Sequence, residues 1–156
     1  MNLEAVIGHS LLAGLSGPQL EAVCSRFREK RFRKGEEIVR EGEEGDGLYF
    51  IAEGTVEILK RDEFLKTMKP KRIALLRAGD TFGEMALLDR EPRSATVLSA
   101  EDAVVLRLPR EDFDALARLD PYAYGVIVSN LARAISRRLR TMDAKFVDAL
   151  FSLERK

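Results

Sequence analysis

The stretch FGEMALLDREPRSATV, residues 82–97, places a glycine–acid pair before a short apolar turn and an arginine that follows a proline. Gly83 has no Cβ, so its backbone can pass close to a ligand and adopt dihedral angles that other residues avoid. Glu84 begins a helical turn, residues 84–88, whose first amides are free to donate hydrogen bonds, and such amides attract an anion. The stretch therefore predicts a binding site for a small phosphate ester.

Two charged side chains divide the chemistry of this site. An ionised Glu84 can only accept hydrogen bonds, so we expect it to face a hydroxyl group of the ligand, such as that of a ribose. Arg93 can donate two parallel hydrogen bonds to a phosphate and keeps its charge when the pocket closes. Ser94 offers a hydroxyl beside it, and residues 95–97 have the composition of a strand that would hold the arginine rigidly. No residue of the stretch is an activated nucleophile.

These residues closely resemble the phosphate-binding cassette of the cyclic nucleotide-binding domain family, of the type found in catabolite activator protein and protein kinase A regulatory subunits. The resemblance implies that Glu84 binds the ribose 2′-hydroxyl, and that Arg93 and the amide of Ala86 bind the cyclic phosphate. Ser94 would lie at the phosphate or base edge. The full set of ligand-binding residues expected from it is Gly83, Glu84, Met85, Ala86, Arg93, Ser94, Ala95, Ile58, Ile73, Met142 and Asp143.

The middle of the chain has the pattern of an all-β fold. Short β-prone segments alternate there with glycines, which indicates a sandwich or a barrel. The family resemblance selects a double-stranded β-helix jelly roll, with N-terminal helices and a long C-terminal helix. Ile58 and Ile73 are then pocket-wall residues, or simply inward-facing strand residues. The expected strands are 37–40, 48–52, 55–60, 72–77, 94–98 and 103–108.

A capping box predicts the first long helix. Ser16 and Gln19 have its spacing, with proline in the first turn, and the helix is expected to run to about Phe27. Cys24 lies on the apolar face of this helix and is expected to pack in the core. His9 is the only histidine, so we expect no metal site, because even a minimal zinc site needs three protein ligands.

The end of the chain predicts a long helix that serves as lid and dimer interface. Asp120 and Pro121 form a helix start, and the helix is expected to reach about Leu153. We treat residues 1–118 as the β-roll with its N-terminal helices and 119–156 as the lid and dimerisation helix of the same unit. A parallel homodimer is expected because apolar residues recur in heptad spacing. They are Val128, Ala132, Ile135, Leu139, Met142, Phe146, Ala149 and Leu153.

The residues that would read the base leave its identity open. In the activator family a threonine–serine pair on this helix contacts the purine, whereas this chain has Met142 and Asp143 at the corresponding positions. A carboxylate can accept from the adenine amino group or from two donors of guanine, so cAMP and cGMP both remain candidates. Binding is expected to swing the helix about a hinge near residues 119–120.

Bulk properties exclude several classes of protein. The 156 residues suit one domain, and the net charge of +0 argues against general affinity for nucleic acid or an anionic membrane. The basic run Arg133, Arg137, Arg138 and Arg140 is expected to be a solvated helix face, and residues 61–71 an exposed hairpin loop. With no membrane span or signal pattern, we expect a cytoplasmic protein.

The function expected is that of a sensor rather than an enzyme. A metal-dependent enzyme on a jelly roll needs several histidines, and the chain has one. No DNA-binding domain is expected after the final helix, so the downstream effector would be another chain or a segment outside this sequence. The alternative left open is a homodimeric interaction module of the same fold that binds no ligand.

Overall fold

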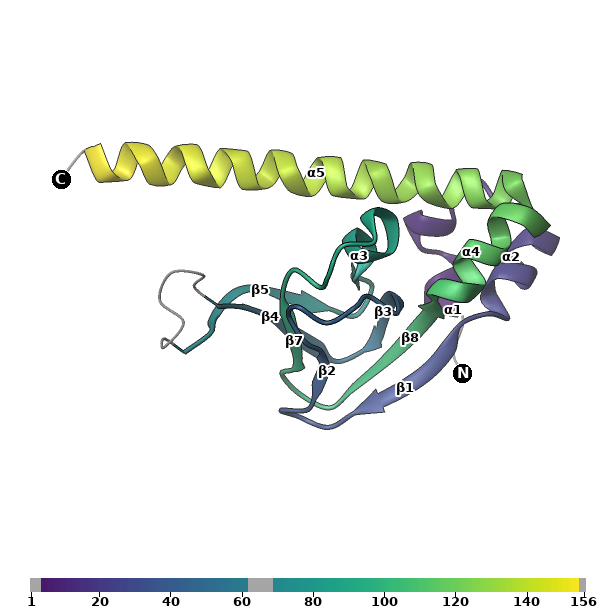
Figure 1. The fold of residues 1–156 in the computed structure, drawn as a ribbon, viewed down its shortest axis with the longest axis horizontal. Coiled ribbons are helices and arrows are strands. Elements are labelled where there is room, and N and C mark those ends of the chain that lie inside the picture. Colours follow the sequence, from purple (N-terminus) through teal and green to yellow (C-terminus); the bar gives the residue numbers. More distant parts are fainter. Residues whose placement is uncertain (1–3, 62–68, 155–156) are drawn as a thin grey trace.

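The computed structural model describes residues 4–61 and 69–154, and shows a jelly roll flanked by helices (Figure 1). Two antiparallel sheets of four strands face each other, in the orders β1-β8-β3-β6 and β2-β7-β4-β5. This confirms the predicted fold class. The strands are β1 Arg28–Phe32, β2 Glu37–Val39, β3 Gly47–Glu53, β4 Thr55–Lys60, β5 Lys71–Arg77, β6 Thr81–Phe82, β7 Thr96–Ser99 and β8 Ala103–Pro109.

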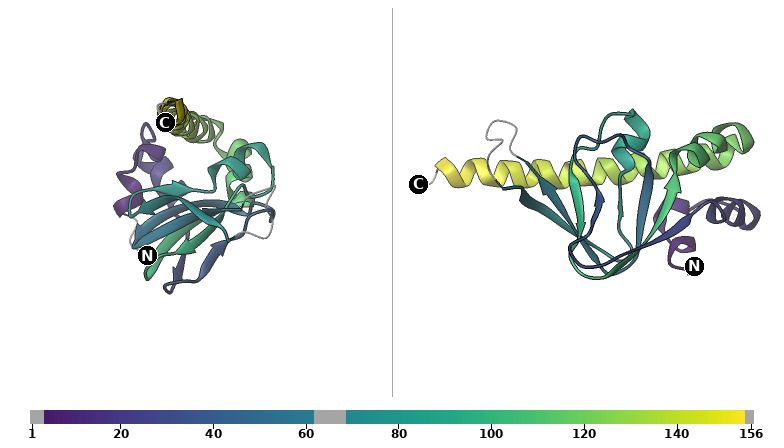
Figure 2. Two further views of the ribbon diagram at one scale, coloured as in Figure 1. Left: turned by 90° about the vertical axis from the view of Figure 1, so that its left-hand side faces the viewer. Right: turned by 60° about the horizontal axis from the view of Figure 1, so that its bottom comes forward.

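Helices gather at one end of the roll, and the last of them runs along its side (Figures 1 and 2). Within the described residues none of these helices combines the length and the apolar character needed to cross a membrane. The helices are α1 Glu4–Ile7, the 3-10 turn η1 Ser10–Leu12, α2 Gly17–Cys24, α3 Glu84–Asp89, α4 Arg110–Leu119 and α5 Pro121–Glu154.

Strand β3 belongs to two hydrophobic cores at once. Its even-numbered side chains Leu48 and Phe50 pack with the helices, whereas Tyr49 and Ile51 pack between the two sheets. Successive side chains of a strand point to opposite faces, so a strand covered on both sides must be apolar throughout. Residues 47–52, GLYFIA, meet this requirement, and the neighbouring strand β8 divides its side chains between the same two cores.

The first turns of α5 are fixed to the body of the domain. Ala123, Ile127 and Leu131 recur every four residues and are buried in the helical core. Asp120 caps the helix, because its Oδ1 accepts from the amide of Ala123 at 2.9 Å. Its Oδ2 accepts from Gln19 Nε2 at 3.0 Å, which ties the start of α5 to α2. The proximal part of α5 is therefore anchored on both sides.

The distal part of α5 leaves the body and is exposed (Figure 2). At 34 residues the helix is about 50 Å long at a rise of 1.5 Å per residue. Within the part of the chain that the structure describes, this half of the helix has large apolar side chains between 45% and 71% exposed. They are Leu139, Met142, Phe146, Val147, Leu150, Phe151 and Leu153.

Several elements differ from the sequence prediction. Helix α2 ends at Cys24 rather than near Phe27, although Phe27 still packs in the core. Strand β1 was missed, because its sequence REKRF is mostly charged and largely exposed and lacks an apolar alternation. The two-residue β6, and α1 at the start of the chain, were also missed. Of the predicted 61–71 loop, residues 62–68 lie outside the described residues.

Helix α4 offers a matched test of this packing. Leu116 is 2% exposed and Leu119 is 67% exposed, on the same helix. We expect Leu116→Ala to lower the free energy of unfolding by about 2–5 kcal/mol, because it leaves a cavity in the helical core. Leu119→Ala should cost about 0.5 kcal/mol or less. Urea denaturation of both variants measures the difference, and equal losses would contradict the packing of α4.

Candidate functional site

Gly83 lets an arginine lie against the turn that begins α3. It has a φ of 83°, in the left-handed region that favours glycine, and it is the N-cap of α3. A Cβ at this position would overlap Arg93 Nη1 and lie 2.9 Å from the carbonyl oxygen of Gly47. Conformation and space both require glycine here, as the sequence predicted.

Glu84 is a buried carboxylate with one oxygen still available. The residue is 3% exposed, and its Oε1 accepts a hydrogen bond from Arg138 Nη1 of α5. Its Oε2 is buried and has no hydrogen-bond partner among the described residues. Since a buried acceptor left unsatisfied is costly, this oxygen is suited to a donor on a ligand.

The pair between Glu84 and Arg138 corrects one sequence prediction. The basic run on α5 was expected to be a solvated helix face, which holds only in part for Arg138: its side chain is 48% exposed but pairs with Glu84. Its guanidinium also donates to the carbonyl oxygen of Thr81 at 3.4 Å. The long helix thus contacts the turn at the start of α3 directly, and in Figure 1 α3 lies beneath the middle of α5.

Arg93 is the second pole of the site, and its side chain is 4% exposed. Its Nη1 donates to the carbonyl oxygen of Gly83 at 3.2 Å, and its Nη2 donates to Asp46 Oδ1 at 2.7 Å and to the carbonyl oxygen of Gly47 at 3.0 Å. The guanidinium also lies 5.5 Å from the ring centroid of Tyr49. A guanidinium has about five N–H donors. Among the described residues these bonds engage three, which leaves two for an anion.

Asp46 is the hub that holds Arg93 in place. Besides Arg93 it binds Arg107 through Oδ2, and Oδ1 also accepts from the hydroxyl of Tyr49 at 2.9 Å. Partial burial acts to raise the pKa of Asp46, but the hydrogen bonds from Tyr49 and Arg93 and the two arginine charges outweigh it and lower that pKa. Burial and the Asp46 carboxylate raise the pKa of Tyr49 to about 12, so its phenol stays neutral.

Backbone and arginine contacts fix the loop that holds Arg93. The amide of Arg93 donates to the carbonyl oxygen of Glu43 at 2.7 Å, and Lys60 Nζ donates to the carbonyl oxygen of Ser94 at 2.7 Å. From α4, Arg110 donates to the carbonyl oxygens of Gly45 at 2.8 Å and Ala86 at 2.6 Å. The turn, the arginine loop and the start of α4 therefore form one connected unit.

Sequence reasoning missed four members of this site: Asp46, Arg107, Arg110 and Arg138. Two of them had a signal that could have been used. Asp46 stands between two glycines directly before a buried strand, and Arg107 interrupts the otherwise apolar run of β8. Arg138 had no such signal, because its partner Glu84 is 54 residues away.

The predicted ligand-binding residues do not all meet in the structure. Gly83, Glu84, Ala86 and Arg93 come together, whereas Met85 and Ser94 are exposed and Ala95 is half-buried. Ile58 packs against the core between the sheets, and Ile73 of β5 is exposed. Met142 and Asp143 are exposed on α5, and no hydrogen bond or ion pair between described residues links them to the turn. These last positions remain predictions.

The sulfur and imidazole groups have structural roles. Cys24 is buried as predicted, and burial raises the pKa of its thiol. His9 caps η1, where its Nδ1 accepts from the amide of Leu11 at 3.1 Å. Within residues 4–61 and 69–154, no group of three or more histidine, cysteine or acidic side chains is arranged to hold a metal ion.

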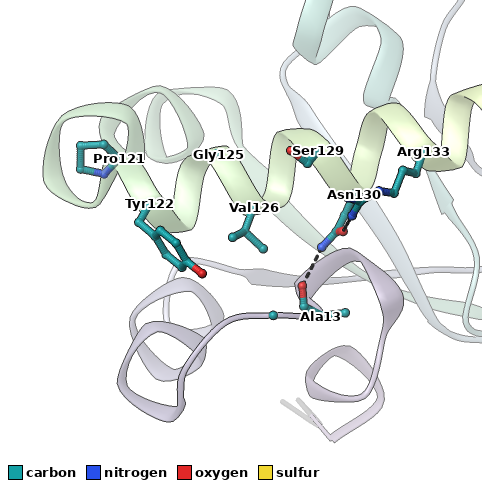
Figure 3. A pocket seen from close by; sticks show the side chains of 9 residues that line it. Ala13, Pro121, Tyr122, Gly125, Val126, Ser129, Asn130 and Arg133 are labelled. Atoms are coloured by element: carbon teal, nitrogen blue, oxygen red, sulfur yellow. Dashed lines mark hydrogen bonds between the residues drawn. The ribbon is translucent and has the colours of Figure 1, made fainter.

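A surface hollow of about 510 Å³ lies apart from this site, between residues 13–14 and the first turns of α5. Tyr122, Val126 and Asn130 point from one face of α5 toward it, and Asn130 Nδ2 donates to the carbonyl oxygen of Ala13 at 2.9 Å (Figure 3). None of the predicted ligand-binding residues lines it. We therefore place the candidate site at Glu84 and Arg93.

Comparison with known proteins gives matches along most of the chain. Residues 29–120 match the family described as cyclic nucleotide-binding domain. The cyclic AMP receptor protein of Thermus thermophilus is 35% identical over 136 residues, which cover 87% of this chain and 60% of that protein. A cAMP-dependent protein kinase regulatory subunit of Eremothecium gossypii is 30% identical over 152 residues, 95% of this chain and 31% of that protein.

Solved structures show the same relationship. The crystal structure of Thermus thermophilus catabolite activator protein superposes with a TM-score of 0.74 and 34% identity, over 88% of this chain and 61% of that chain. This chain therefore spans less than two thirds of the length of each of these relatives.

The close approach at Gly83 can be tested against a glycine of similar conformation. Gly79 has a φ of 94°, but a Cβ there would meet nothing within 4 Å. We expect Gly79→Ala to cost about 1–2 kcal/mol of stability from backbone strain alone. Gly83→Ala should cost more, because its methyl group also displaces Arg93. Thermal unfolding compares the two variants, and equal costs would show that the space around Gly83 does not constrain the site.

Proposed function

The chain belongs to the cyclic nucleotide-binding domain family, and from this premise we propose that it is a sensor that binds a cyclic nucleoside monophosphate, cAMP or cGMP. One observation carries the proposal: beside Gly83 lie a buried carboxylate oxygen of Glu84 that has no hydrogen-bond partner among the described residues, and the buried guanidinium of Arg93, which these residues only partly engage. The first suits a hydroxyl donor and the second suits an anion. A sugar joined to a phosphate supplies both groups in one molecule.

The roles of the residues follow from these two poles. We assign Glu84 Oε2 to the ribose 2′-hydroxyl, and Arg93 with the amide of Ala86 to the cyclic phosphate. Gly83 and Met85 shape the turn, and Ser94 and Ala95 line the phosphate edge. Ile58 and Ile73 form the pocket wall, and Met142 and Asp143 face the base. The domain itself carries out no catalysis in this proposal.

Arg138 gives the ligand a route to the long helix. It holds one oxygen of Glu84 while the ribose takes the other, so ligand and helix share a single carboxylate. Ligand binding then biases the position of α5 about the junction at Asp120, where α4 ends and α5 begins. A ligand shifts such an equilibrium only by its difference in affinity for the two arrangements. The segment 119–156 acts as the lid.

We also propose that the protein is a parallel homodimer through the distal half of α5. The heptad residues from Leu139 onward have exposed apolar side chains on one side of a helix that extends beyond its own body. The effector that reads the signal is a different chain or a segment outside this sequence.

Binding measurements test the cassette directly. Arg93→Ala should weaken binding of cAMP or cGMP about ten- to a hundredfold, because charge-assisted hydrogen bonds contribute about 1.5–3 kcal/mol. Glu84→Gln should also weaken binding, since it loses the charge that pairs with Arg138 and, with its oxygen facing Arg138, offers the ribose hydroxyl an NH2 donor in place of an acceptor. Arg90→Ala is the control, because Arg90 is in the same segment, is exposed and pairs with Asp114. Isothermal titration calorimetry gives the dissociation constants.

Two results would contradict this proposal in different ways. If Arg93→Ala binds cyclic nucleotides as tightly as the unaltered protein, the cassette assignment is wrong. If no cyclic mononucleotide or dinucleotide raises the melting temperature of the unaltered protein, the alternative is favoured, a homodimeric module of the same fold that binds no ligand. A ligand that binds the folded state must raise that temperature.

Sedimentation tests the dimer. We expect the protein to sediment at about 35 kDa, twice the 17.5 kDa of one chain. Phe146→Glu places a charge in the apolar face and should give a monomer. Ala144→Glu, on the opposite side of the helix by its spacing, should remain a dimer. A monomeric unaltered protein, or a dimer that Phe146→Glu leaves intact, would rule out this interface.

A further inference from the structure

Arg107 is a charge in a place where strands are otherwise apolar. It interrupts β8, whose other members from Ala103 to Pro109 are all buried, and its side chain is 16% exposed. Its Nε is buried and has no hydrogen-bond partner among the described residues. A buried donor without a partner lowers stability, so packing alone does not explain an arginine here.

The position of Arg107 connects it to the phosphate site. Its Cα is paired with that of Tyr49 across β8 and β3, and its Nη1 donates to Asp46 Oδ2. Asp46 Oδ1 accepts from Arg93 at 2.7 Å. A single carboxylate thus bridges two guanidinium groups, with Arg93 on Oδ1 and Arg107 on Oδ2.

The charges of these three side chains set the net charge that a bound phosphate would experience. Arg93 and Arg107 together carry two positive charges and Asp46 carries one negative charge, which leaves the triad net positive. Without Arg107, Asp46 would neutralise Arg93. Tyr49 adds no charge, and Glu84 is offset by Arg138. Arg110 is a further cation nearby, which keeps its charge while it donates to the carbonyl oxygens of Gly45 and Ala86, and which is the same with or without Arg107. In a partly buried site such a difference acts strongly on an anion.

We propose that Arg107 is a positioning residue for the phosphate: it holds the second oxygen of Asp46 and keeps the triad of Arg93, Asp46 and Arg107 net positive. The phosphate can then bind the two free N–H groups of Arg93 while Asp46 continues to hold that side chain. Arg107 acts through Asp46 and need not touch the ligand. This inference rests on the proposed function.

Substitutions that remove or keep the positive charge of Arg107 distinguish this electrostatic role from a role in packing. Arg107→Gln should weaken binding of cAMP or cGMP about tenfold, because the phosphate then meets a neutral Arg93–Asp46 pair. Arg107→Lys keeps the charge and should bind nearly as the unaltered protein does.

Calorimetry at low and high salt measures these variants, with Arg28→Gln as the matched control. Arg28 is the Cα partner of Arg107 on β1, is exposed and pairs with Asp112. The affinity of Arg107→Gln should depend less on salt than that of the unaltered protein, because less charge attracts the ligand. Should Arg107→Gln fail to fold, Arg107→Met, which keeps the aliphatic stem, replaces it.

The outcomes distinguish this inference from the function on which it rests. Equal affinity of Arg107→Gln and the unaltered protein overturns the role of Arg107, while loss of binding by Arg93→Ala in the same experiment keeps the proposed function. An Arg107→Lys variant that binds no better than Arg107→Gln also overturns it. An unaltered protein that binds neither cAMP nor cGMP overturns both.

Discussion

The burial of the Arg93 guanidinium is the constraint on which the rest of the site depends. A cation removed from water needs a counter-charge and acceptors on every side that no ligand occupies. Asp46 supplies the counter-charge, and the carbonyl oxygens of Gly47 and Gly83 supply two further acceptors. The hydrogen bonds that the Arg93 guanidinium needs therefore fix the positions of the loop that leads into β3 and of the turn that starts α3.

The proximity of Gly83, Glu84 and Arg93 could be predicted from the sequence because its signals are local. The distance from Gly83 to Arg93 is ten residues, and the flanking strands and glycine turns have patterns of short range. Two contacts that complete the site, Arg93 with Gly47 and Asp46 with Arg107, span 46 and 61 residues. Such pairs depend on the strand register between β3 and β8. The hydrophobic pattern of the sequence limits the possible registers but does not determine which residues are paired. Strand β1 was not predicted for a related reason. It is held by backbone pairing with β8 rather than by an apolar face.

Helix α5 joins two different physical environments. Its first turns are buried by Ala123, Ile127 and Leu131, while its distal turns carry apolar side chains in the open. Arg138 lies between these parts and binds Glu84. Among the described residues, the helix is thus packed in the core at its start, bound to Glu84 and to the carbonyl oxygen of Thr81 through Arg138 at its middle, and exposed beyond that point.

Strand β3 gives the site a further property. Alternate side chains of β3 pack in two separate hydrophobic cores, so the strand cannot move without disturbing both cores. The residues that directly precede it are therefore attached to a fixed strand. Gly47 is the first residue of β3, and Asp46 directly precedes it. The groups that hold Arg93 are therefore ordered before any ligand arrives, and a side chain that is already immobile avoids an entropy loss of about 0.5–1.5 kcal/mol on binding. A site of this kind gains affinity because its side chains lose little conformational entropy on binding.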